Sequence, residues 1–245
     1  MNRLAWIFGL LLLICVMPGA LQAQEISVSL GDGESLTARS IQLILLITVL
    51  SIAPGLVIMI TCFPFLVTVL SILRQAIGLQ QAPPNMLIVS LALFLTYFVM
   101  EPVFTAAWQT GIDPLLSESI DAETAFQRTM DPFRDFMAAR LDPDTFTALA
   151  TLRPGADLDA PARDAQLSLL VPSFLLSEMS RAFQIGFVIF LPFLVIDLVV
   201  AAILMSMGMM MVPPAVVALP FKLAFFVVAD GWSLISGALV RSYFN

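Results

Sequence analysis

Long apolar runs constrain the fold of this chain more than any other feature. Four stretches, 41–73, 86–108, 167–204 and 212–240, carry almost no charge. Each is at least as long as the roughly 20 residues that an α-helix needs to cross a bilayer. Because a helix satisfies its backbone hydrogen bonds within its own segment, these stretches predict an all-α membrane protein.

Prolines inside the apolar stretches predict kinks. Pro54 and Pro64 lie in the first stretch, and Pro172 and Pro192 are expected to interrupt the third. Proline removes a backbone hydrogen bond and clashes with the preceding turn of a helix. The expected fold is therefore a pair of kinked apolar helical hairpins.

One polar, acidic segment separates the two hairpins. Residues 109–166 hold eleven Asp and Glu against five Arg, a net charge of −6, whereas the whole chain carries −7. Asp131–Pro132, Asp142–Pro143 and Arg153–Pro154 predict short helices between turns. We expect a small, acidic, helical extracytoplasmic domain, and no part of the sequence is basic enough to indicate nucleic-acid binding.

The N-terminus has the pattern of a secretory signal peptide. Arg3 precedes an apolar run, and Ala23 offers a cleavage site, although an uncleaved anchor is the alternative. Translocation of this end places the acidic segment outside the cytoplasm and the tip of the second hairpin inside. The predicted divisions are a signal peptide (1–23), an exposed tail (24–40), a first apolar hairpin (41–108), an acidic periplasmic domain (109–166) and a second apolar hairpin (167–245).

The tip of the second hairpin is a methionine-rich loop over 205–211. Five of its seven residues are methionine, and Gly208 and Pro213–Pro214 are expected to break the helix there: Met205, Met207, Met209, Met210 and Met211. Methionine is flexible and polarizable, so it seals irregular gaps. The loop is therefore either a packing filler in a helical bundle or a deformable plug in a membrane pore.

Charged side chains inside apolar stretches need partners. The six such residues are Glu101, Glu178, Arg181, Asp197, Lys222 and Asp230. An ion at the bilayer centre costs about 2.5–3.5 kcal/mol on insertion scales, so it normally pairs or faces protein or water. Glu178 and Arg181 share a helix face. Asp197 and Lys222, on opposite arms of the methionine hairpin, are expected to pair within one chain or between neighbouring copies. These charges either only hold helices together or act directly in transport.

The sequence holds no recognisable catalytic or metal-binding constellation. It has no histidine, nucleophile elbow, phosphate loop, HExxH or CxxC motif. An intramembrane aspartyl enzyme would need a second aspartate beside Asp197, and Asp230 is the only candidate. We predict a protein that is not an enzyme and has no cofactor or metal. A small-solute or ion channel and an intramembrane hydrolase are the alternatives from other classes.

Several long blocks resemble the FliP family of flagellar type III export-gate proteins, whose injectisome relatives are called SctR. The similarity covers about residues 46–242. The blocks are LSILRQAIG (70–78), QQAPPN (80–85), AFQIGF (182–187), FLPFLVIDLVV (190–200), LPFKL (219–223) and DGWSL (230–234). The sequence departs from the family pattern at three places: the pair Pro64–Phe65, the pair Ser180–Arg181, and Glu101. These departures concern individual salt bridges and not the fold.

The resemblance implies a subunit of the export gate in the flagellar basal body, in the bacterial inner membrane with a periplasmic portion. It implies a homo-oligomer, a pentamer, with FliQ-like and FliR-like subunits around a pore. FlhB-like and FlhA-like proteins complete the apparatus, and unfolded rod, hook and filament proteins pass through. In the family the methionine loop seals the closed pore, and Met207, Met209, Met210 and Met211 match it. The alternative is an injectisome (SctR-type) subunit, although a signal peptide favours the flagellar branch.

Overall fold

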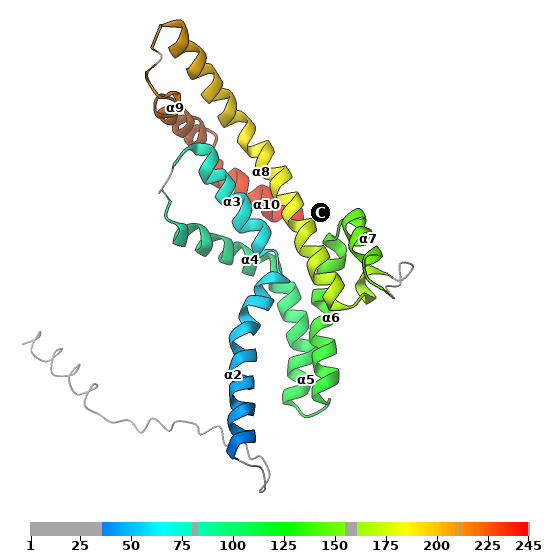
Figure 1. Cartoon of the computed structure of the whole chain (residues 1–245). Helices are drawn as coiled ribbons and strands as arrows, with labels where there is room; N and C mark the ends of the chain where they lie inside the picture. The colour runs from blue at the N-terminus through cyan, green and yellow to red at the C-terminus, as the bar shows by residue number, and fades with distance from the viewer. Residues whose placement is uncertain (1–35, 80–82, 155–160, 210, 245) are drawn as a thin grey trace, which may run out of the picture. The chain divides into compact units, whose positions relative to one another are not determined.

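The computed structural model describes residues 36–79, 83–154, 161–209 and 211–244, and within these ranges every regular element is a helix. The chain divides into two units between Val49 and Leu50, and the second contains all the helices from α3 onward. Figure 1 shows the helices. The predicted signal peptide and most of the predicted tail lie outside the described residues.

The helices follow one another with short connections. In chain order they are α2 (Leu36–Met59), α3 (Phe63–Ile77), α4 (Asn85–Ala107), the π-helix η1 (Trp108–Ile112), α5 (Asp113–Leu116), α6 (Ala122–Arg140), α7 (Pro143–Thr151), the 3-10 helix η2 (Ala162–Asp164), α8 (Leu167–Ser206), α9 (Pro214–Val228) and α10 (Gly231–Phe244).

Three helical segments of the described chain are long and apolar enough to cross a membrane: Ser40–Met59, Asn85–Leu116 and Leu167–Ser206. Together, α9 and α10 would form a fourth membrane-spanning segment, with a bend of 61° between them. The bend falls at Asp230, whose φ is +46°. This architecture confirms the prediction of an all-α membrane protein.

The core of the second unit forms where α3 packs along α8. One face of α3 is fully buried, including Phe65, Leu70 and Leu73. Gly186 of α8 permits the close approach, because a Cβ there would lie 2.5 Å from Cδ1 of Ile72. The other neighbours of this pair are α4 and α9 against α3, and α6, α7 and α9 against α8.

Proline breaks the helices at fewer places than the sequence predicts. The predicted interruptions at Pro172 and Pro192 are wrong, because α8 continues through both for 40 residues. The predicted turn at Asp131–Pro132 is also wrong, since Pro132 lies inside α6. A proline inside a helix removes one backbone hydrogen bond and crowds the preceding turn, which apolar helices of membrane proteins tolerate. The break in the first stretch falls between α2 and α3, and Pro64 occupies the first turn of α3, where its missing N–H is not needed.

Two helices of the acidic segment, α6 and α7, begin with aspartate N-caps. Asp121 and Asp142 are N-caps whose carboxylates accept the N–H groups of Thr124 and Thr145 at 3.3 and 2.9 Å. Hydrogen bonds from these threonines hold the pKa of both carboxyls below the usual value. The predicted helix start at Asp142–Pro143 is thus confirmed. α6 packs against α4 and η1, and α7 packs against α8, so the segment is tied to both apolar hairpins.

Candidate functional site

The methionine loop begins as a defined helix cap. Met207 is the C-cap of α8, and Gly208 follows with a φ of +74°, a left-handed conformation that glycine adopts without strain. The N–H of Gly208 bonds to the Met205 carbonyl at 3.1 Å, and that of Met209 bonds to the Leu204 carbonyl at 3.0 Å. This pair of bonds is a Schellman motif, which satisfies carbonyls that a helix end leaves free. The sequence therefore fixes a sharp turn at this point.

The methionine side chains of the loop are not packed into a core of this chain. Met205, Met207, Met209 and Met211 expose 62, 67, 43 and 97% of their surface. Met210 lies outside the described residues. After the turn, Pro213 caps α9 and Pro214 starts it, so the second arm begins immediately. The single chain thus presents flexible apolar side chains at the tip of the α8–α9 hairpin.

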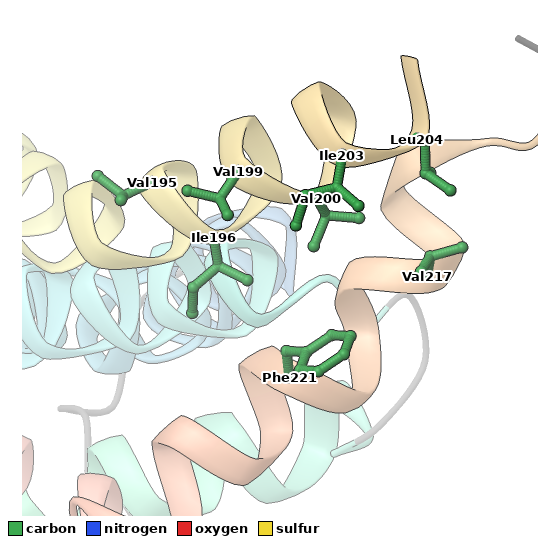
Figure 2. Close-up of a pocket in the computed structure, with 8 residues that line it drawn as sticks. All are labelled: Val195, Ile196, Val199, Val200, Ile203, Leu204, Val217 and Phe221. Carbon is green, nitrogen blue, oxygen red and sulfur yellow. The ribbon is translucent and has the colours of Figure 1, made fainter. Parts of the chain in front are cut away.

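An apolar groove runs between the two arms just behind the loop. It has a volume of about 400 Å³. Figure 2 shows its lining of eight apolar residues, six from α8 and two from α9: Val195, Ile196, Val199, Val200, Ile203, Leu204, Val217 and Phe221. The tip of the hairpin is therefore apolar both at the loop and between the arms.

Lys222 and Asp197 form an ion pair within one chain. Nζ of Lys222 donates to Oδ2 of Asp197 at 2.6 Å and to the carbonyl of Ala76 at 3.1 Å. Lys222 is 6% exposed, whereas the side chain of Asp197 is 30% exposed. Of the two arrangements that the sequence left open, the structure of the single chain contains the intramolecular one.

The ammonium of Lys222 also holds the end of α3. Ala76 lies in the last turn of α3, whose C-cap is Gly78 at a φ of +87°. A positive charge at this position complements the partial negative charge of a helix C-terminus. Lys222 thus joins three helices, α3, α8 and α9. Oδ1 of Asp197 is buried and has no hydrogen-bond partner within the described part of the chain.

Glu178 lies at the centre of a second buried polar cluster. Its side chain is 1% exposed and accepts from Nε of Arg140 at 3.0 Å and from the hydroxyl of Tyr243. Arg181, the partner expected from the sequence, lies at 3.9 Å and is 38% exposed. The hydrogen-bond donors to the buried carboxylate, Arg140 and Tyr243, are therefore both distant from it in the sequence.

Arg140 is the residue that sequence reasoning missed. It ends α6 in the acidic segment, donates to the Ser242 carbonyl at 2.8 Å and lies 4.0 Å above the ring of Tyr243. The cluster thus connects the acidic segment, α8 and the end of α10. A lone arginine before Leu-Asp-Pro gives no sequence signal for a partner that lies 102 residues away.

The remaining predicted charges are not gathered into a site. Glu101 and Asp230 are exposed, and neither takes part in an ion pair among the described side chains. The described residues also hold no group of three or more Asp, Glu, Cys or His with metal-binding geometry. The structure therefore brings together Asp197 with Lys222 and Glu178 with Arg140, and it does not place Asp230 in a pair with Asp197.

These features define a helical membrane protein with two buried polar clusters and an exposed methionine turn at the tip of an apolar hairpin. The FliP family model matches residues 46–239. The chain belongs to the FliP family.

Individual relatives agree with this assignment over most of the chain. The flagellar biosynthetic protein FliP of Caulobacter vibrioides is 48% identical over 247 residues, which cover 99% of this chain and 92% of the relative. The protein of the same name from Rhizobium meliloti is 51% identical over 199 residues, 81% of each chain. That of Bacillus subtilis is 43% identical over 217 residues, 88% of this chain and 96% of the relative.

Proposed function

We propose that this chain is a subunit of the flagellar type III protein export gate and forms part of the pore through which unfolded rod, hook and filament proteins pass. Membership of the FliP family and the flagellar names of its relatives support this proposal. They also favour the flagellar system over an injectisome. The component lies in the bacterial inner membrane, at the flagellar basal body, with the acidic segment on the periplasmic side.

The observation that carries the pore role is the exposure of the methionine loop. A filler would be buried in its own chain, whereas Met207 and Met211 are 67 and 97% exposed at the end of a 40-residue helix. Several copies with their loops directed to one axis would bury these side chains against one another. A hydrophobic constriction of this kind blocks ions by excluding water, and flexible thioethers can separate to let a polypeptide pass.

The two buried clusters give the hairpin a fixed geometry. Lys222 ties the second arm to α3, and Glu178 ties α8 to the acidic segment. We assign Glu178, Arg181, Asp197 and Lys222 a structural role in positioning the loop and in contacts between subunits. The chain has no enzyme activity in this proposal and requires no cofactor or metal.

The partners follow from the same proposal. Copies of this chain form a homo-oligomer, a pentamer, with FliQ-like and FliR-like subunits. FlhB-like and FlhA-like proteins act with this complex, and the exported proteins are transient partners. The small-solute channel alternative predicts transport by the purified chain alone, whereas a gate subunit requires its partners.

Replacement of Met209–Met211 by alanine tests the gasket. We expect cells that carry the altered gate to leak ions or small molecules, because alanine is too short to close the constriction, while flagellar export continues. The measurement is membrane conductance or dye entry, together with motility. Met86→Ala is the control, since Met86 is a methionine of α4 that is also exposed, at 78%, and does not belong to the loop. Unchanged conductance in an assembled alanine variant would refute the gasket role.

A further inference from the structure

Tyr243, in the last turn of α10, contacts four distant residues with one side chain. Its hydroxyl donates to Glu178, and its ring stacks on that of Phe136, with centroids 6.0 Å apart and planes inclined by 13°. The ring of Phe65 meets it edge-on at 5.6 Å, and Cζ of Arg140 lies 4.0 Å from its centroid. Tyr243 therefore connects the end of α10 with α3, α6 and α8.

The body of α10 is sparsely buried, and its other firm contact lies at its start. Of its 14 residues, only Gly231 and Leu239 are buried. The ring of Phe226 on α9 packs edge-on against Trp232 at 5.4 Å, and a Cβ on Gly231 would lie 2.1 Å from Cε2 of Phe226. A segment with few buried contacts opens at a lower free-energy cost than the core does. α10 is thus held mainly at its two ends.

Asp230 provides the joint between α9 and α10. It has a φ of +46°, where the two helices meet at 61°. This left-handed conformation is unfavourable for most residues, although aspartate tolerates it. Residues at the ends of elements often absorb the change in backbone angles when one element moves against another. Release of Tyr243 would therefore let α10 turn about Asp230, and α9 would lose its anchored C-terminal end.

The Tyr243 end of α10 covers a part of the core that contains a thiol. Cys62 caps α3, is 0% exposed and belongs to the apolar cluster that includes Phe65 and packs against Tyr243. A buried thiol is inert toward alkylating reagents. Cys62 therefore reports whether this part of the core is open.

We propose that the last turn of α10 is a latch. When Tyr243 is docked, it fixes α10 and, through the bend at Asp230, the α9 arm of the methionine hairpin. When Tyr243 is released, α10 moves as one unit. The latch connects the acidic segment, which supplies Phe136 and Arg140, with the arm that carries the loop. Its link to the loop rests on the proposed function, whereas the latch itself is a property of the single chain.

Alkylation of Cys62 in the purified full-length chain tests the latch. Tyr243→Ala should raise the rate of reaction with N-ethylmaleimide at Cys62, located by peptide mapping, by at least about tenfold, because it removes the ring that closes the core. Tyr243→Phe keeps the ring and loses only the donor to Glu178, so its rate should be intermediate. Phe244→Ala is the matched control, since this neighbouring aromatic residue is 58% exposed, and it should leave the rate unchanged.

Hydrogen exchange separates a latch from a general loss of stability. In Tyr243→Ala, the amides of α10 should exchange faster together, while those of α3 and α8 stay protected. Unchanged Cys62 reactivity and unchanged exchange in α10 would overturn the proposal. Loss of protection throughout the chain would also overturn it, since Tyr243 would then only stabilise the whole fold.

Conductance of the assembled gate tests the link to the loop. With the FliQ-like and FliR-like subunits present, Tyr243→Ala should leak more ions than Phe244→Ala, because the α9 arm is no longer anchored. A sealed gate in which Cys62 reacts would contradict that link. If the unaltered chain forms no complex, the proposed function fails, whereas the alkylation result on the single chain still decides the latch.

Discussion

At the scale of single residues, burial decides which ion pairs contribute to the stability of the fold. The pair Arg140–Glu178 is 13 and 1% exposed, whereas the pair Arg163–Asp135 is 49 and 55% exposed at the shorter separation of 2.7 Å. From the distances alone, the Arg163–Asp135 pair would be expected to contribute more to stability. A surface pair contributes about 0–1 kcal/mol because water screens it. Removal of one partner from a buried pair leaves an uncompensated charge and is far more costly.

Arg140→Ala should therefore destabilise the protein by about 3–5 kcal/mol, because Glu178 would be left buried and unpaired. Arg163→Ala is the matched control and should change stability by no more than about 1 kcal/mol. Thermal or denaturant unfolding of the detergent-solubilised chain measures the difference. Equal effects of the two substitutions would show that the buried cluster does not hold the acidic segment to α8 and α10.

At the scale of helices, one ammonium group connects the two arms of the methionine hairpin with α3. Lys222 on α9 reaches both Asp197 on α8 and the last turn of α3, so the two arms and the helix beside them share one contact. The groove lined by Ile196 and Phe221 lies between the same arms. The ion pair and the groove thus both lie between the arms that carry the loop.

Lys222→Ala should prevent assembly or function of the gate, because Asp197 and the end of α3 would lose their common partner. Exchange of the charges, Asp197→Lys with Lys222→Asp, should restore function only in part, since an aspartate at position 222 cannot donate to the Ala76 carbonyl. Recovery of the complex and motility are the measurements. Wild-type behaviour of Lys222→Ala would show that the contact is dispensable.

At the scale of the whole molecule, the sequence predicts the helices better than the contacts between them. The apolar stretches indicate the spans, and Gly208 with Pro213–Pro214 marks the turn of the second hairpin. The long-range polar contacts carry no such signal. The Lys222 acceptor on α3 is a backbone carbonyl 146 residues away, and any residue type supplies a carbonyl. Local propensity likewise predicts a break at Pro172 and Pro192, whereas α8 continues through both, as apolar helices of membrane proteins tolerate proline.

The central claim, that the methionine loops of several copies close one pore, is tested most directly by electron microscopy of the chain assembled with its FliQ-like and FliR-like subunits. The account predicts a ring of copies in which Met207 and Met209–Met211 converge on the axis at its narrowest point. A map in which these loops face lipid, or lie away from the axis while another segment forms the constriction, would contradict it.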